Sequence, residues 1–147
     1  MLKIIRAKFH GIYVTNADLD YHGSITLDPI FCKILKIYPL EFVEIWNKNN
    51  GTRFSTYVIY GEPHSRCCVL NGAAARNCQK NDELIIAAYK FCQVSEIKNE
   101  LPKILTFNND NTINKILEYR VKEEEDWYSF SIDETTNTGN IISLAHM

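Results

Sequence analysis

The segment "LEFVEIWNKNNGTRFSTYVIY", residues 40–60, carries a strong β-hairpin pattern. Its two ends, residues 40–47 and 52–60, are rich in aromatic and β-branched residues, which suit the pleated surface of a sheet. Between them, the pair Asn50-Gly51 tolerates the positive φ of a tight turn. The segment therefore predicts two strands joined by a short loop.

Further strands are expected on both sides of this hairpin. Residues 5–10 alternate with a period of two, which places apolar side chains on one face (Ile5, Ala7 and Phe9) and basic ones on the other (Arg6, Lys8 and His10). Shorter β-rich pieces are residues 12–15, 24–27, 67–70, 82–91 and 103–107. The segment "NNDN", 108–111, reads as a turn.

Helices are expected to be few and short. Asp28 can cap the N-terminus of a helix, and Pro29 suits its first position. Pro39 cannot continue the helical ladder and should end that helix. Residues 94–101 predict a short helix, and "NGAAAR", 71–76, a turn that leads into one. Many short strands without a βα rhythm predict a mainly β fold, a small barrel with helical inserts.

The composition suits one ordinary globular domain of 147 residues, with 46% hydrophobic and 23% charged residues. A net charge of −2 gives no pull toward nucleic acid, and no apolar run is long enough to cross a membrane. The five cysteines are odd in number and form no C-x-x-C, so neither disulfides nor a metal site are expected. Reduced thiols, together with the lack of a secretory signal pattern, predict a cytoplasmic protein.

Four segments together resemble the pyruvoyl-dependent aspartate 1-decarboxylase family: "AKFH" (7–10), "ADLDYHGSITLD" (17–28), "NNGTRFSTYVI" (49–59) and "LNGAAAR" (70–76). The resemblance runs from residue 1 to about residue 115. It implies a double-psi β-barrel over residues 1–118, followed by an atypical polar extension over residues 119–147. It also implies a homotetramer with active sites between subunits.

The resemblance further implies an inactive proenzyme that cuts itself between Gly23 and Ser24, into residues 1–23 and 24–147. A serine hydroxyl can attack the preceding carbonyl, and a glycine there adds no Cβ bulk. Ser24 then becomes a pyruvoyl group, which forms a Schiff base with the substrate and replaces a separate cofactor. The implied enzyme is a carboxy-lyase that converts L-aspartate to β-alanine and CO2 for pantothenate and coenzyme A synthesis.

The remaining site residues are also carried over from the family. Tyr57 is the implied proton donor, and the Thr56 hydroxyl is the candidate donor to the oxyanion formed during cleavage. Fixed cations should hold the two carboxylates of aspartate. The implied substrate-binding set is Lys8, Arg53, Thr56, Asn71, Gly72, Ala73 and Ala74. His10 and Tyr21 line the same neighbourhood without an assigned role, and His22 reads as a loop residue.

Several alternatives stay open at this stage. A catalytically silent barrel could bind an acidic metabolite or a protein partner through Arg53 and Lys8, whereas a nucleic-acid-binding barrel is disfavoured because no basic stripe exists. The sequence does not decide between aspartate and glutamate, nor whether an accessory protein is needed for cleavage. Weak order is expected after Glu118, with aromatic residues docking on the body: Trp127, Tyr128 and Phe130. This extension could instead cover a subunit edge or bind a partner.

Overall fold

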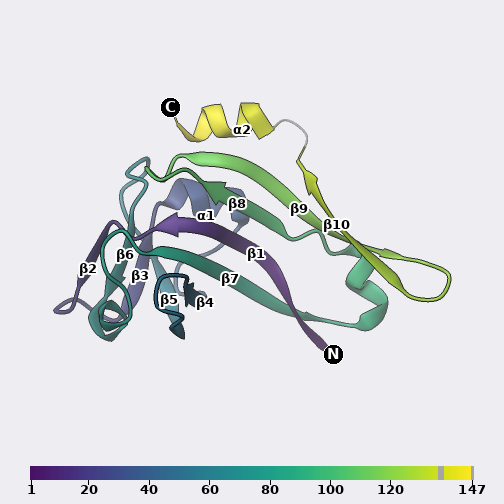
Figure 1. Cartoon of the computed structure of the whole chain (residues 1–147), viewed down its shortest axis with the longest axis horizontal. Helices are drawn as coiled ribbons and strands as arrows, with labels where there is room; N and C mark the ends of the chain where they lie inside the picture. Colours follow the sequence, from purple (N-terminus) through teal and green to yellow (C-terminus); the bar gives the residue numbers. More distant parts are fainter. Residues whose placement is uncertain (136–137, 147) are drawn as a thin grey trace.

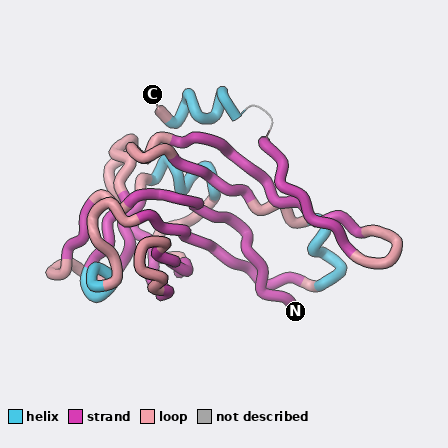
Figure 2. Tube along the Cα trace, viewed as in Figure 1, coloured by secondary structure: helices cyan, strands magenta, loops and turns pink. Residues whose placement is uncertain are grey.

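The computed structural model describes residues 1–135 and 138–146 and is built mainly of strands (Figures 1 and 2). The strands are β1 (Leu2–Tyr13), β2 (Asn16–Asp18), β3 (Ser24–Leu27), β4 (Phe42–Asn47), β5 (Arg53–Tyr60), β6 (Cys68–Asn71), β7 (Glu83–Cys92), β8 (Lys103–Phe107), β9 (Ile113–Glu123) and β10 (Tyr128–Glu134). The helices are α1 (Pro29–Leu35), α2 (Thr138–Ala145) and two 3-10 turns, η1 (Gly72–Arg76) and η2 (Val94–Asn99). No helix in the described ranges is long and apolar enough to span a membrane.

In the described chain the strands form one curved sheet of ten strands, in the order β10-β9-β8-β1-β7-β4-β5-β3-β6-β2. Parallel pairs join strands that are distant in sequence, β1 with β8, β3 with β5 and β2 with β6, while the other pairs are antiparallel. These crossovers fold the sheet back on itself around one core. The expected mainly β barrel with short helices is confirmed.

The hairpin of residues 40–60 forms as expected. Strands β4 and β5 pair antiparallel, with Trp46 opposite Arg53. Gly51 takes a φ of +75°, and its N–H donates to the Asn47 carbonyl at 2.9 Å. Only glycine adopts this left-handed conformation at low cost, so Gly51 closes the loop.

The prediction of a separate strand at residues 12–15 was wrong. Residues 12 and 13 belong to β1 rather than to a separate strand at 12–15. The register of β1 against β7 shifts between His10 and Ile12, at Gly11, whose φ is +85°. A β-bulge at a glycine bends a strand without ending it. Because the bulge interrupts the alternation of side chains, the sequence pattern alone suggests that the strand ends there.

Helix α1 packs its apolar face on the barrel through an aromatic cluster. The ring of Phe31 lies 6.4 Å from that of Phe9 and 5.1 Å from that of Phe107, both edge to face. The helix ends at Leu35, because Lys36 takes a left-handed conformation that caps it before Pro39 is reached. At the other end, the Asp28 side chain accepts a hydrogen bond from the Ile30 N–H at 2.9 Å, as expected of an N-cap.

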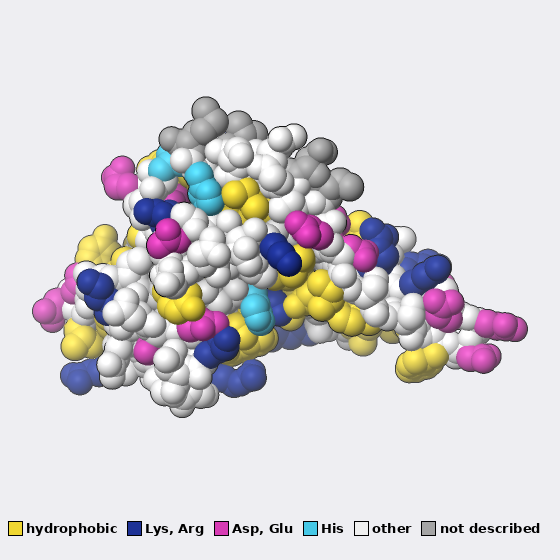
Figure 3. All heavy atoms as spheres, turned by 45° about the horizontal axis from the view of Figure 1, so that its top comes forward, with side chains coloured by type: hydrophobic (Ala, Val, Ile, Leu, Met, Phe, Trp, Pro, Cys, Tyr) yellow, Lys and Arg dark blue, Asp and Glu magenta, His cyan; other side chains and the backbone are white. Residues whose placement is uncertain are grey.

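The expected weak order after Glu118 is wrong. Strand β9 crosses residue 118 without a break and pairs with β10 over seven residue pairs, from Tyr128↔Glu123 to Glu134↔Leu117. The acidic run Glu123–Asp126 begins at the last residue of β9 and continues into the loop between the two strands, and acidic side chains gather at the tip of this arm (Figure 3). Trp127 is 76% exposed near the tip and does not dock on the body. The part of the extension at residues 136, 137 and 147 lies outside the described residues.

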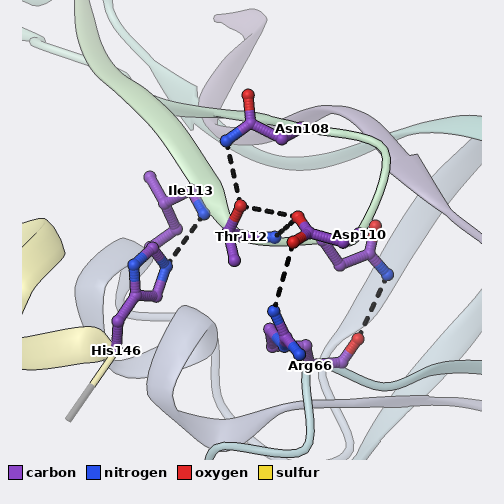
Figure 4. A network of polar contacts seen from close by, with 7 residues as sticks. Arg66, Asn108, Asp110, Thr112, Ile113 and His146 are labelled. Atoms are coloured by element: carbon purple, nitrogen blue, oxygen red, sulfur yellow. Dashed lines mark hydrogen bonds and ion pairs between the residues drawn. The ribbon is translucent and has the colours of Figure 1, made fainter.

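Two histidines link the end of helix α2 to the barrel. His146 Nε2 accepts a hydrogen bond from the Ile113 N–H at 3.0 Å (Figure 4). His64 Nδ1 lies 3.0 Å from the Ala145 carbonyl oxygen. Beside them, Arg66 pairs with Asp110 at 3.6 Å. These contacts tie the C-terminus to the loops at one end of the sheet.

Asp28 is the most heavily used polar side chain near α1, and its loss should destabilise the fold. It is 1% exposed and accepts hydrogen bonds from three backbone N–H groups, those of Ile30, His64 and Arg66. Asp28→Ala would leave these donors unpaired and should lower the free energy of unfolding by about 2–4 kcal/mol in urea titrations. Asp126→Ala, in the exposed loop, is the control and should change it by less than about 0.5 kcal/mol. Equal effects of the two variants would contradict the assignment.

Candidate active site

Ser24 is the first residue of β3 and is fully buried. Its hydroxyl donates to the His22 carbonyl at 3.2 Å and accepts a hydrogen bond from Asn71 Nδ2 at 2.9 Å. Asn71 is paired with Ser24 across β3 and β6 and also donates to the Thr26 hydroxyl at 2.8 Å. The hydroxyl oxygen of Ser24 is therefore held in place on both sides, directly after Gly23.

Gly72 packs against the backbone just before Ser24. A Cβ at Gly72 would lie 2.8 Å from both Cα and N of Gly23 and 2.9 Å from the Tyr21 carbonyl oxygen. The φ of Gly72 is +62°, which also favours glycine. A side chain at residue 72 therefore has no room. Together, Gly72 packs on the backbone of Gly23 and Asn71 binds the hydroxyl of Ser24, and we call this pair of contacts the clamp.

Tyr57 lies on the strand next to Ser24. The parallel pairing of Ile25 with Val58 places Ser24 and Tyr57 one position earlier, with side chains on the same face of the sheet. The Tyr57 ring packs against Phe42, with centroids 6.1 Å apart. Thr56 points to the opposite face, where it is buried beside the core. Among the described residues, the hydrogen bond to the Ser24 hydroxyl comes from Asn71 and not from Thr56.

The expected cations share the outer face of the sheet. Arg53 is exposed, and its guanidinium lies 4.7 Å from the centre of the Trp46 ring, a cation–π contact. Across the sheet, Trp46 pairs with Ile85, which pairs with His10. Lys8 follows the same face two residues earlier in β1, but it is only 8% exposed.

Lys8 does not lie beside Ser24 of the same chain. Strands β1 and β3 are four steps apart in the sheet, roughly 19 Å along its surface at about 4.8 Å per strand. Strand alternation places both side chains on the face away from the core, with Lys8 between the buried Ala7 and Phe9 and Ser24 next to the buried Ile25. The structure thus brings together Gly23, Ser24, Asn71 and Gly72, and holds Lys8 apart from them.

The residues without an assigned role have distinct environments. His10 Nδ1 is buried and has no hydrogen-bond partner within the described chain. Burial, and secondly the Lys8 ammonium, lower the pKa of His10, so its imidazole is neutral at pH 7. Tyr21 and His22 are exposed and stack edge to face beside the Gly23 link. Ala73 is exposed and Ala74 is buried in η1, directly after the clamp.

Two contacts escaped the sequence reading. Thr26 shares the Asn71 amide with Ser24. Strand alternation over "SIT" places Thr26 on the same face as Ser24 and could have revealed this contact. Tyr119 accepts a hydrogen bond from Lys8, 111 residues away in sequence, and no local pattern reveals that contact.

Four of the five cysteines are buried. All five are free thiols. Burial raises the pKa of Cys32 to about 12 and that of Cys78 to about 11, so both stay protonated and unreactive at neutral pH.

The fold and the clamp define a mainly β barrel with a buried serine hydroxyl that directly follows a glycine. Residues 1–114 match the family model described as aspartate decarboxylase. A protein named aspartate 1-decarboxylase from Paramagnetospirillum magneticum is 64% identical over 126 residues, which cover 85% of this chain and 70% of that protein. Relatives of the same name from Rhodospirillum centenum and Agrobacterium fabrum are 58% and 55% identical, covering 82% and 84% of this chain and 80% and 79% of their own lengths. The chain belongs to the aspartate decarboxylase family, whose members depend on a pyruvoyl group.

The clamp predicts a difference between two glycine substitutions. Gly72→Ala should destabilise the fold by about 2–4 kcal/mol, because the left-handed φ and the clash with Gly23 act together. Gly51→Ala is a matched control, since its φ is +75° but no atom lies within 4 Å of the added Cβ. It should cost only about 1–2 kcal/mol. Chemical denaturation measures both, and a Gly72 variant no less stable than the Gly51 variant would argue against the close packing.

Proposed function

We propose that this protein is a self-processing, pyruvoyl-dependent decarboxylase that converts L-aspartate to β-alanine and CO2 for pantothenate and coenzyme A synthesis. The relatives named aspartate 1-decarboxylase support the reaction. The observation that carries the proposal is the buried Ser24 hydroxyl, held by Asn71 directly after a glycine whose backbone is clamped by Gly72. The five free thiols of the protein support a cytoplasmic location in this proposal.

Self-cleavage uses only groups of the chain and water. The Ser24 Oγ attacks the Gly23 carbonyl carbon, the C–N bond breaks, and the Oγ proton passes to the released nitrogen, which leaves an ester. Loss of the Ser24 Cα proton then breaks the Cβ–Oγ bond and releases the Gly23 carboxylate. Hydrolysis of the remaining dehydroalanine gives ammonia and a pyruvoyl group at the start of residues 24–147.

Asn71 is well placed to assist the first of these steps. Its amide donates to Oγ from the side of β6, so the serine oxygen keeps one orientation while it approaches the carbonyl. Glycine at 23 leaves that carbonyl free of side-chain bulk. In this proposal the Thr56 hydroxyl serves as donor to the oxyanion, which requires it to move from its buried place on the opposite face.

The surroundings of Ser24 suit a small planar ketone. Thr26, Asn71 and Gly72 line the position with one amide, one hydroxyl and no added bulk. The pyruvoyl group, once formed, supplies an electron sink for the loss of CO2. Tyr57 shares that face of the sheet, which supports its assignment as the proton donor to the substrate carbon.

Substrate recognition in this proposal depends on two cations. Arg53 presents its planar fork from the face of Trp46 and binds one carboxylate of aspartate. Lys8 binds the other, and the small residues Gly72, Ala73 and Ala74 allow the dicarboxylate to approach the backbone closely. Both cations are present on the outer face of the sheet.

In this proposal the protein is a homotetramer with active sites between subunits, which the separation of Lys8 and Ser24 by four strand steps supports. The Lys8 that serves a given Ser24 then belongs to a neighbouring copy. An accessory maturation protein is a candidate further partner, and cleavage of the purified protein with and without warming measures whether it matures by itself.

Replacement of Ser24 should abolish both self-cleavage and decarboxylation. Ser24→Ala should remain one uncut chain and form no β-alanine from aspartate, because the attacking oxygen is gone. Ser131→Ala, on the exposed outer strand, is the control and should cut and decarboxylate like the wild type. Denaturing gels and β-alanine assays measure the two properties. A wild-type protein that stays uncut and inactive after prolonged warming would refute the proposal.

Tyr57 should matter for turnover and not for cleavage. Tyr57→Phe keeps the ring that packs on Phe42 but removes the proton donor, and kcat should fall by about 100-fold while both fragments still appear. Tyr38→Phe, at a 64% exposed tyrosine, should leave kcat unchanged. Normal turnover in Tyr57→Phe would remove that residue from its assigned role.

A further inference from the structure

The arm formed by β9 and β10 reaches back to Lys8. Lys8 Nζ donates a hydrogen bond of 2.5 Å to the Tyr119 hydroxyl and lies 4.9 Å from the centre of its ring. Tyr119 lies on β9 beyond residue 114, where the family match ends. A residue of the C-terminal arm therefore contacts a residue of the proposed substrate site directly.

Tyr119 is itself held firmly in place. Its N–H donates to the Pro102 carbonyl at 2.9 Å, and its backbone pairs with Ile132 of β10. Its ring meets that of Phe130 edge to face, with centroids 5.3 Å apart. Backbone pairing and ring packing both restrict the phenol, so its oxygen is a fixed point to which the flexible lysine side chain is anchored.

The chemistry of the contact leaves the charge of Lys8 available. None of the ion pairs between described residues involves Lys8, although it is only 8% exposed. A buried ammonium without a carboxylate partner is costly, and a neutral phenol orients it without cancelling its charge. An ammonium has three donors, and the phenol takes one of them. The neighbouring His10 is neutral and adds no second positive charge beside it.

We infer that Tyr119 is a positioning residue that holds the Lys8 ammonium ready for a carboxylate of the substrate. This inference rests on the proposed function, because it takes Lys8 as a substrate ligand. It also assigns a purpose to the arm: the C-terminal hairpin supports the active site from beyond residue 114, where the match to the family model ends. A carboxylate at 119 would have consumed the charge, whereas the phenol preserves it.

The test removes only the hydroxyl. Tyr119→Phe keeps the ring and its contact with Phe130, and should still yield both fragments. The KM for aspartate should rise about tenfold with kcat changed less than about twofold, as expected for one lost hydrogen bond to a charged group. Tyr128→Phe, on the same arm, is the matched control and should match the wild type in both constants.

Two further readings make the test specific. Calorimetry with succinate, a dicarboxylate without an amine, should show a Kd about tenfold weaker in Tyr119→Phe than in the wild type. In a Lys8→Ala background, Tyr119→Phe should add no further change in KM, because the hydroxyl acts through Lys8. An unchanged KM and Kd in Tyr119→Phe, or an effect that persists undiminished in Lys8→Ala, would overturn the inference. Loss of β-alanine formation in the wild type would instead refute the proposed function.

Discussion

The contact of Gly72 with the Gly23 backbone, joined to the hydrogen bond from Asn71 to Ser24, is the constraint around which the site is organised. A Cβ at residue 72 would stand 2.8 Å from Gly23, so the close approach of these two distant segments requires glycine at 72, whereas a Cβ at residue 23 would meet no atom within 4 Å. Strands β3 and β6 hold this contact in register by pairing Ser24 with Asn71. The pairing of β3 with β6 thus holds the Gly23–Ser24 peptide bond beside Asn71 and Gly72.

Much of the barrel followed from local patterns. The hairpin at 40–60 and the N-cap at Asp28 could be read from turn residues and strand alternation, because both depend on nearby sequence. The bulge at Gly11 and the ordered arm after Glu118 could not. The arm is ordered by pairing of β9 with β8 and β10, and its polar outer residues hide that pairing in a single sequence.

The arrangement of the candidate site was likewise only partly predictable from the sequence. Family resemblance named Ser24, Asn71 and Gly72, and the structure brings them into contact, but their roles stay predictions. Which face each residue takes required the sheet: Tyr57 shares the face of Ser24, whereas Thr56 points toward the core. The link between Lys8 and Tyr119 joins β1 to β9 across β8, and such a contact arises only from tertiary packing.

The central claim is that the Gly23–Ser24 bond breaks and Ser24 becomes a carbonyl group. Intact-mass spectrometry of the purified wild-type protein, before and after treatment with a hydrazine reagent, tests it most directly. The account predicts two chains, residues 1–23 and 24–147, with the larger chain lighter by one ammonia than a chain that begins with serine. That chain should gain one hydrazone. A single chain of 147 residues, or a larger fragment that begins with intact serine and does not react, would contradict the account.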